Sequence, residues 1–116
     1  MPRIIIETIP AEKQRYDTLG DWRYNENGDL IITVSDYSVL EPSGFLIALH
    51  ELVEVALCRR RGVSQDAVDN FDMAFAGEGE PGDDPGSPYR REHRFSMMIE
   101  HLVAHEMGVV GYGKVE

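Results

Sequence analysis

The sequence predicts one α+β domain of 116 residues, in which a small antiparallel sheet of about three strands (residues 3–35) packs against three helices. The first 40 residues hold short β-branched segments separated by a turn, whereas residues 43–108 hold apolar side chains at helical spacing around an acidic loop. A chain of this length can bury one core but not two. We therefore expect a single domain, with a β-rich part (1–40) followed by a helical part (43–108).

The β-rich part is predicted from its β-branched residues and its turn residues. Residues 3–9 (RIIIETI) are followed by Pro10, which favours a strand that ends there. Residues 25–29 (NENGD) include the pair Asn27-Gly28, which tolerates the positive φ angles of tight turns. The apolar segments on either side of this turn are therefore expected to form a hairpin.

Three helices are expected, at about residues 44–61, 65–76 and 89–107. Ser43 and Ser64 are suitable N-caps for the first two, and Gly62 is positioned to end the first. Residues 77–88 (GEGEPGDDPGSP) are too rich in glycine, proline and acids for a helix and predict a long loop. The tail from residue 109 onward is expected either to pair with the sheet or to fray.

Charge and composition exclude several classes of protein. The chain has 11 Lys+Arg against 21 Asp+Glu, a formal net charge of −10, and an acidic surface is repelled by the phosphates of a nucleic acid. It has no signal-like N-terminus and no apolar run of the roughly 20 residues that cross a bilayer, so we expect no membrane contact. Cys58 is the single cysteine, which excludes an intrachain disulfide and favours a reducing, cytoplasmic location.

The first helix contains the pattern HExxE at residues 50–54. His50 and Glu54 are four residues apart, so they lie on one face of the helix, at the edge of its apolar stripe. A histidine and a carboxylate at this spacing are suitable ligands for a divalent metal ion. Glu51 is expected further toward solvent, where it would act as the general base that polarises a metal-bound water.

The last helix carries histidines and acids that complete this pattern. His93 and Glu100 fall on a mostly apolar face, and two ionisable groups buried there require partners. If the two helices pack by these faces, His50, Glu54 and His93 converge into two nitrogens and one oxygen, a set that suits zinc.

Three further residues are candidates for supporting or alternative ligand roles. Glu100 lies two turns from His93, so we expect it to hydrogen-bond a ligand or to replace His93 as one. Asp72 is a candidate further ligand or a carboxylate that orients a histidine. His101 is a candidate of the same kind, although its i, i+4 pair with His105 lies on the more polar side and favours solvation.

A structural alternative stays open. HExxE arises easily in acidic helical proteins, and charged pairs at this spacing commonly face solvent. The same residues would then form a buried His–Glu hydrogen-bond network that fixes the pairing of the helices.

Four segments, QRYDTLGDW (14–22), HELVE (50–54), EPGDD (80–84) and PYRREH (88–93), together resemble a family of small, uncharacterised proteins encoded in bacteriophages and prophages. The resemblance covers most of the chain and implies a bacterial host cytoplasm, but no activity. The HExxE helix is also similar, over a few residues, to the active-site helix of zincin-type metallopeptidases. The sequence departs from that pattern at Glu54, where a zincin has its second histidine.

Two functional hypotheses follow. The first is a small metal-binding protein, with zinc as the expected ion and a zincin-like, metal-dependent hydrolase as the expected activity. The alternative is a non-enzymatic phage accessory protein that binds an unidentified protein or peptide partner through its acidic surface. Metal content discriminates between them.

Overall fold

A computed structural model describes residues 1–109 of the chain, and it has the expected α+β architecture. Three strands form one sheet: β1 (Ile4–Ile9), β2 (Gly20–Tyr24) and β3 (Leu30–Ser35), in the spatial order β1-β3-β2. A short 3₁₀ helix, η1 (Ala11–Lys13), follows β1. The expectation that the tail pairs with the sheet or frays concerns residues 109–116, of which 110–116 lie outside the described residues.

The sheet is mixed rather than wholly antiparallel. β2 and β3 form the expected antiparallel hairpin, in which Trp22 pairs with Ile32 and the turn uses Gly28 at φ 81°. β1 instead pairs with β3 in parallel. The connection between β1 and β2 crosses over β3 on one face of the sheet, where the Gln14 side-chain amide oxygen accepts a 2.9 Å hydrogen bond from Thr33 Oγ1. This crossover places β3, all of whose residues are buried, in the centre of the sheet.

Helix α1 (Pro42–Arg61) packs on the other face of the sheet. Trp22, Ile32 and Val34 point from the sheet into this interface, and they meet Ala48 and Val55 of the helix. Cys58 is fully buried in the same core, and burial raises the pKa of its thiol to about 12, so it is an inert filler rather than a nucleophile.

The ends of α1 follow from local chemistry. The helix begins two residues earlier than expected, with Pro42 in its first turn and Glu41 as the N-cap in place of Ser43. Proline is well suited to this position because its missing N–H has no partner there in any helix. Gly62 ends the helix at φ 75°, as expected, and Arg61 in the last turn pairs with Glu92 at 3.2 Å.

Two further α-helices follow within residues 1–109. They are α2 (Gln65–Ala74), capped by Ser64 as expected, and α3 (Arg90–Glu106). A single 3₁₀ turn, η2 (Pro81–Asp83), lies in the long loop before α3. The predicted loop is therefore partly ordered by its own backbone hydrogen bonds, such as Asp83 N–H to Glu80 O at 3.1 Å.

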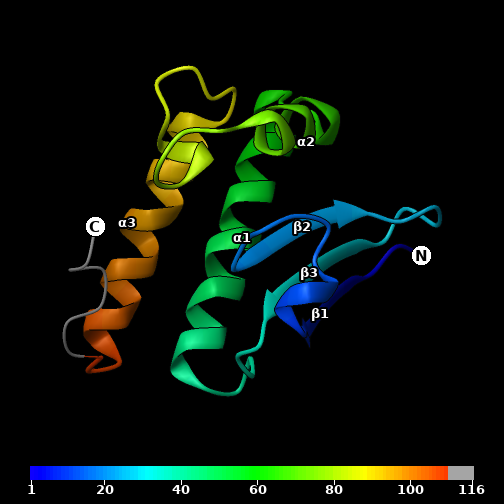
Figure 1. Cartoon of the computed structure of the whole chain (residues 1–116). Coiled ribbons are helices and arrows are strands. Elements are labelled where there is room, and N and C mark those ends of the chain that lie inside the picture. Colours follow the sequence, from blue (N-terminus) through cyan, green and yellow to red (C-terminus); the bar gives the residue numbers. More distant parts are fainter. Residues whose placement is uncertain (110–116) are drawn as a thin grey trace.

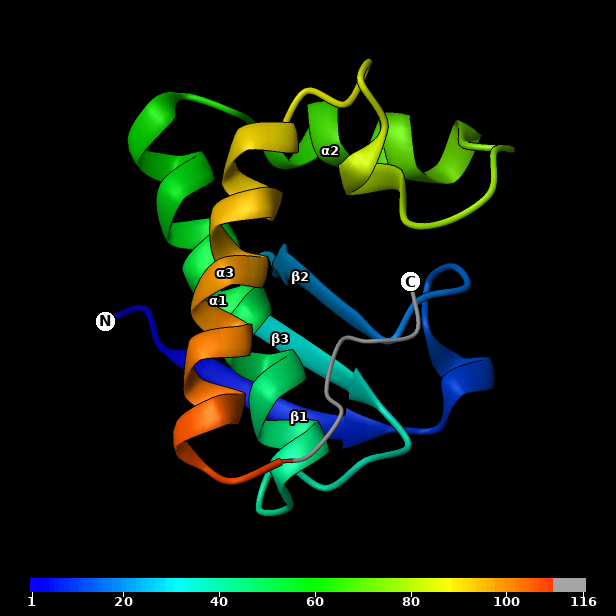
Figure 2. The same ribbon diagram turned by 90° about the vertical axis from the view of Figure 1, so that its left-hand side faces the viewer.

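The elements form three layers: the sheet, then α1, then α3 (Figures 1 and 2). α1 and α3 run antiparallel, and the loop that contains η2 lies against the first turns of α3. α1 therefore has one side on the sheet and another side on α3, so that residues of the HExxE pattern can meet both layers. No helix in the described part of the chain is long and apolar enough to cross a membrane.

Candidate metal centre

Three ligand atoms from two helices converge between α1 and α3. They are His50 Nε2 and Glu54 Oε2 of α1 and His93 Nδ1 of α3. The two histidine nitrogens are 3.2 Å apart, and each lies 3.1 Å from the Glu54 oxygen. All three side chains are buried, and together they form a group that could hold a metal ion.

The size of this triangle matches a tetrahedral metal site. Ligand atoms bound to zinc at about 2.0–2.1 Å in tetrahedral directions are separated from one another by about 3.3 Å. The three observed separations lie within 0.2 Å of that value. Three protein ligands also leave the fourth tetrahedral direction open, as in catalytic zinc sites.

A further side chain holds each of the two candidate ligands on α1, His50 and Glu54. Glu100 Oε1 lies 2.7 Å from His50 Nδ1, so it fixes the ring with Nε2 facing the other ligands. The indole N–H of Trp22 donates a 3.0 Å hydrogen bond to the second oxygen of Glu54. Glu100 thus hydrogen-bonds a candidate ligand, the first of the two roles expected for it. Trp22 links the site to the sheet core.

The ring of His93 is held from the side of the loop. Its Nε2 faces the carboxylates of Glu80 and Asp83, at 3.5 and 3.6 Å, which are the N-cap and the last residue of η2. Gly82 lies flat against the ring: a Cβ at this residue would be 2.4 Å from His93 Cγ. Only glycine allows the loop backbone to approach so closely, and the approach fixes the ring between α1 and the loop.

The electrostatics of the triangle follow from these contacts. Burial lowers the pKa of His50, but its contacts with Glu100 and Glu54 outweigh burial and raise it to about 11. Burial likewise lowers the pKa of His93, and its contacts with Glu54 and Glu80 raise it to about 9. Burial raises the pKa of Glu54, but the two histidines lower it to about 2. The metal-free site is therefore a carboxylate between two protonated imidazoles at neutral pH.

Glu51 is buried, contrary to the expectation that it lies toward solvent. The residue is 9% exposed, because β2 begins directly against this turn of α1. A Cβ on Gly20 would be 3.0 Å from Glu51 Cγ, so the glycine allows this contact. Helical periodicity showed that Glu51 is off the apolar stripe, but not that the sheet covers it. Burial and the neighbouring charge of Glu54 raise the pKa of Glu51 well above its usual range.

Asp72 and His101 lie apart from the three converging atoms. Asp72 accepts hydrogen bonds from the hydroxyls of Tyr89 (2.7 Å) and Tyr16 (3.0 Å), and it orients these tyrosines rather than a histidine. The Tyr89 ring in turn packs edge-on to His93, with ring centroids 5.9 Å apart. His101 is half buried two turns beyond His93 and does not belong to the converging group found among the described residues.

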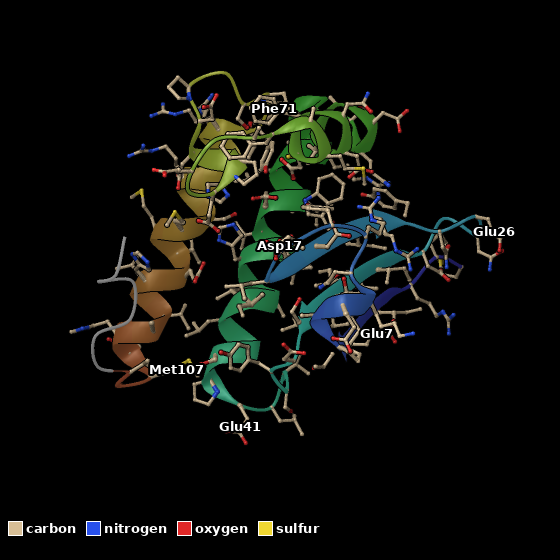
Figure 3. All side chains as sticks on the ribbon, in the orientation of Figure 1. Glu7, Asp17, Glu26, Glu41, Phe71 and Met107 are labelled. Carbon is tan, nitrogen blue, oxygen red and sulfur yellow. The ribbon has the colours of Figure 1, made fainter. Side chains whose placement is uncertain are left out.

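A cleft of about 280 Å³ opens onto the site. Its walls come from the segment before β2, from α1 and from the loop around η2. Figure 3 shows side chains in the space between α1 and α3. Asp17, labelled in Figure 3, lies on the wall before β2. Exposed apolar side chains at the mouth include Leu19 and Tyr37. A small group or an extended chain could therefore reach Glu51 and the three ligand atoms from outside.

Trp22, Glu80 and Asp83 are the site residues that sequence reasoning missed. The signal for the two acids was available: Glu80 and Asp83 are three residues apart in the loop that leads into the helix of His93. Trp22 gave no such signal, because its contact with Glu54 depends on how the sheet docks on α1.

The Trp22 contact makes a testable prediction. Trp22→Phe keeps an aromatic ring in the core but removes the donor to Glu54, so we expect zinc affinity to fall by about 10- to 100-fold. Unfolding free energy should fall by about 1–3 kcal/mol, because one buried oxygen loses its partner. Calorimetric zinc titration and urea unfolding measure both. The control is Tyr24→Phe, because the Tyr24 ring packs edge-on against Trp22 but supplies none of the three ligand atoms. This variant should change zinc affinity little.

Comparison with protein-family models, with curated proteins and with solved structures finds no match to this chain. The geometry of His50, Glu54 and His93, with the groups around them, is therefore the basis for assigning a function.

Proposed function

We propose that this protein binds a zinc ion through His50, Glu54 and His93 and uses it to hydrolyse a carbonyl substrate, with Glu51 as general base. The observation that carries the proposal is the triangle of ligand atoms with sides of 3.1–3.2 Å. Two imidazole nitrogens and one carboxylate oxygen are a ligand set typical of catalytic zinc. Outer carboxylates beside both histidines match the usual environment of zinc-bound imidazoles.

A metal ion explains the triangle better than hydrogen bonds alone. In a metal-free network with both histidines protonated, each ring directs an N–H at the same Glu54 oxygen, with the two nitrogens 3.2 Å apart. Two protonated rings at that separation repel each other in a buried site. A single divalent ion replaces both protons and is attracted to all three ligand atoms. The two nitrogens then coordinate the ion with their lone pairs, and the repulsion between two protonated rings is removed.

The surroundings of the site support hydrolysis of an amide or ester. Zinc in such a site lowers the pKa of water and polarises a carbonyl group. Glu51 lines the same cleft, and burial and the charge of Glu54 raise its pKa, which is the direction that a general base requires. Among the described residues that line the cleft, six are acids and none is Lys or Arg. A phosphate ester would find no cation there besides the metal, so a neutral or cationic substrate is favoured.

The alternative function retains one observation in its favour. Several apolar side chains on the outer face of α3 are exposed, namely Phe95, Met98 and Leu102. Such a face fits a protein that binds a partner, whether in a phage-infected cell or elsewhere, with the His/Glu cluster as a purely structural network. Only the metal-binding proposal requires a stoichiometric ion.

Zinc titration by calorimetry tests the proposal. Because the metal-free histidines have pKa values of about 11 and about 9, both are protonated at pH 7, and zinc must displace about two protons to bind. Zinc affinity should therefore rise with pH between pH 6 and 8. The measured binding heat should change in proportion to the ionisation enthalpy of the buffer. A protein that binds no zinc, or binds it with no proton release, would contradict the assignment of these ligands.

A further inference from the structure

We propose that Glu80, Asp83 and the outer nitrogen of His93 form a second divalent-cation site, so that the imidazole of His93 bridges two metal ions. The inference rests on the proposed zinc site, because that site takes Nδ1 of the same ring. It assigns a role to the acidic loop, which the hydrolase proposal uses only as a cover for His93.

The backbone of η2 brings the two acids to one side of the loop. Glu80 is the N-cap of η2 and Asp83 is its last residue, one 3₁₀ turn later, so the turn brings the two acids back to the same side of the loop. Both carboxylates face His93 Nε2, at 3.5 and 3.6 Å. The three ligand atoms lie within 4.8 Å of one another, close enough to coordinate one ion.

The distances suit a shared ion better than a hydrogen bond. An imidazole N–H bonded to a carboxylate lies at about 2.7–2.9 Å, and neither acid approaches that closely. Two ligands of one tetrahedral ion are instead about 3.3 Å apart. His93 Nε2 is buried, in a side chain that is 5% exposed, and it makes no hydrogen bond within residues 1–109. A buried polar nitrogen aimed at two carboxylates without bonding either one points to a ligand between them.

The loop holds this arrangement by contacts other than the acids themselves. Gly82, between the two acids, lies against the His93 ring. The side chain of Arg90, on the first turn of α3, donates a 3.2 Å hydrogen bond to the Asp83 carbonyl oxygen. Glu80 and Asp83 thus remain near each other although both carry negative charge, and a cation between them removes that repulsion. Their side chains are 58% and 42% exposed, so an ion can reach them from solvent.

Charge balance favours two ions over one. Glu54, Glu80 and Asp83 supply three negative charges around His93. When a second ion binds Nε2, that nitrogen releases its proton to solvent and the ring becomes an imidazolate with a fourth negative charge. Two divalent ions then neutralise the cluster. With one ion and a neutral ring, one of the three carboxylate charges stays uncompensated beside His93.

Equilibrium dialysis and calorimetric titration with zinc test the second site. We expect the wild-type protein to bind two zinc ions, the second more weakly. The double variant E80Q/D83N should bind one. The control E78Q/D84N removes the same charge from the same loop. Asn at position 84 keeps an oxygen that can accept the hydrogen bond from the Gly86 N–H. This control should therefore still bind two ions. Circular dichroism verifies that each variant is folded.

Stoichiometry separates the two proposals. A wild-type stoichiometry of two that falls to one in E80Q/D83N supports the second site. One ion in the wild type, with E80Q/D83N only weakening its binding, overturns the second site and leaves the acids as groups that orient His93. If E80Q/D83N still binds two ions, the second site is also overturned. A wild-type protein that binds no ion contradicts the proposed zinc site itself.

A spectroscopic test uses cobalt(II) in place of zinc. Two cobalt ions bridged by one imidazolate couple magnetically, and E80Q/D83N should lose this coupling.

Discussion

His50→Ala is expected to abolish stoichiometric zinc binding and to remove the stabilisation that zinc gives the wild-type protein. Zinc at 100 times its Kd stabilises a protein that binds it only when folded by about 2.7 kcal/mol. For a domain of this size that corresponds to a rise in Tm of about 10 °C. The variant should show no such rise, because His50 supplies the corner of the triangle that lies 3.2 Å from His93 and 3.1 Å from Glu54.

The controls for this experiment are within the chain. His105→Ala makes the same substitution at an exposed position in the last turn of α3, and it should keep the full rise in Tm. Glu54→Gln preserves side-chain volume where His50→Ala leaves a cavity, and it should also lose zinc binding. If elemental analysis finds equal zinc in wild-type and His50→Ala protein, these ligands are wrong.

Glu51→Gln is expected to retain zinc but to lower kcat/KM for hydrolysis by about 10²- to 10⁴-fold, the usual contribution of a general base. The substitution keeps the shape of the side chain. Burial raises the pKa of Glu51 because it disfavours the charged carboxylate, so a neutral amide of the same shape costs little at this position. We therefore expect the variant to fold normally. A panel of neutral and cationic amides and esters provides the assay.

The matched control for Glu51→Gln is Glu41→Gln, at the exposed start of the same helix. It should leave both zinc content and activity unchanged. If Glu51→Gln hydrolyses every responsive substrate at the wild-type rate while still binding zinc, the metal site remains and the role of Glu51 as base is disproved.

Much of the helical half of the site was predictable because helix geometry is local. The spacing of His50 and Glu54 placed both on one face of α1, and the apolar setting of His93 and Glu100 indicated that α3 packs against it. Contacts that cross the sheet or the loop were not predictable in this way. Asp72 illustrates the difference: its place on α2 gave no indication that two tyrosines far away in sequence occupy its carboxylate.

The sequence alone determined the α+β class, the β2–β3 hairpin, the three helices and the candidate ligands His50, Glu54 and His93, because turn residues and apolar periodicity specify local structure. The tertiary structure decided the rest. It placed β3 between β1 and β2, buried Glu51 under the start of β2, and brought Trp22, Glu80 and Asp83 to the ligands. Trp22 is 32 positions from Glu54, and Glu80 and Asp83 are 13 and 10 positions from His93. The packing of whole layers, rather than any local pattern, determines these contacts.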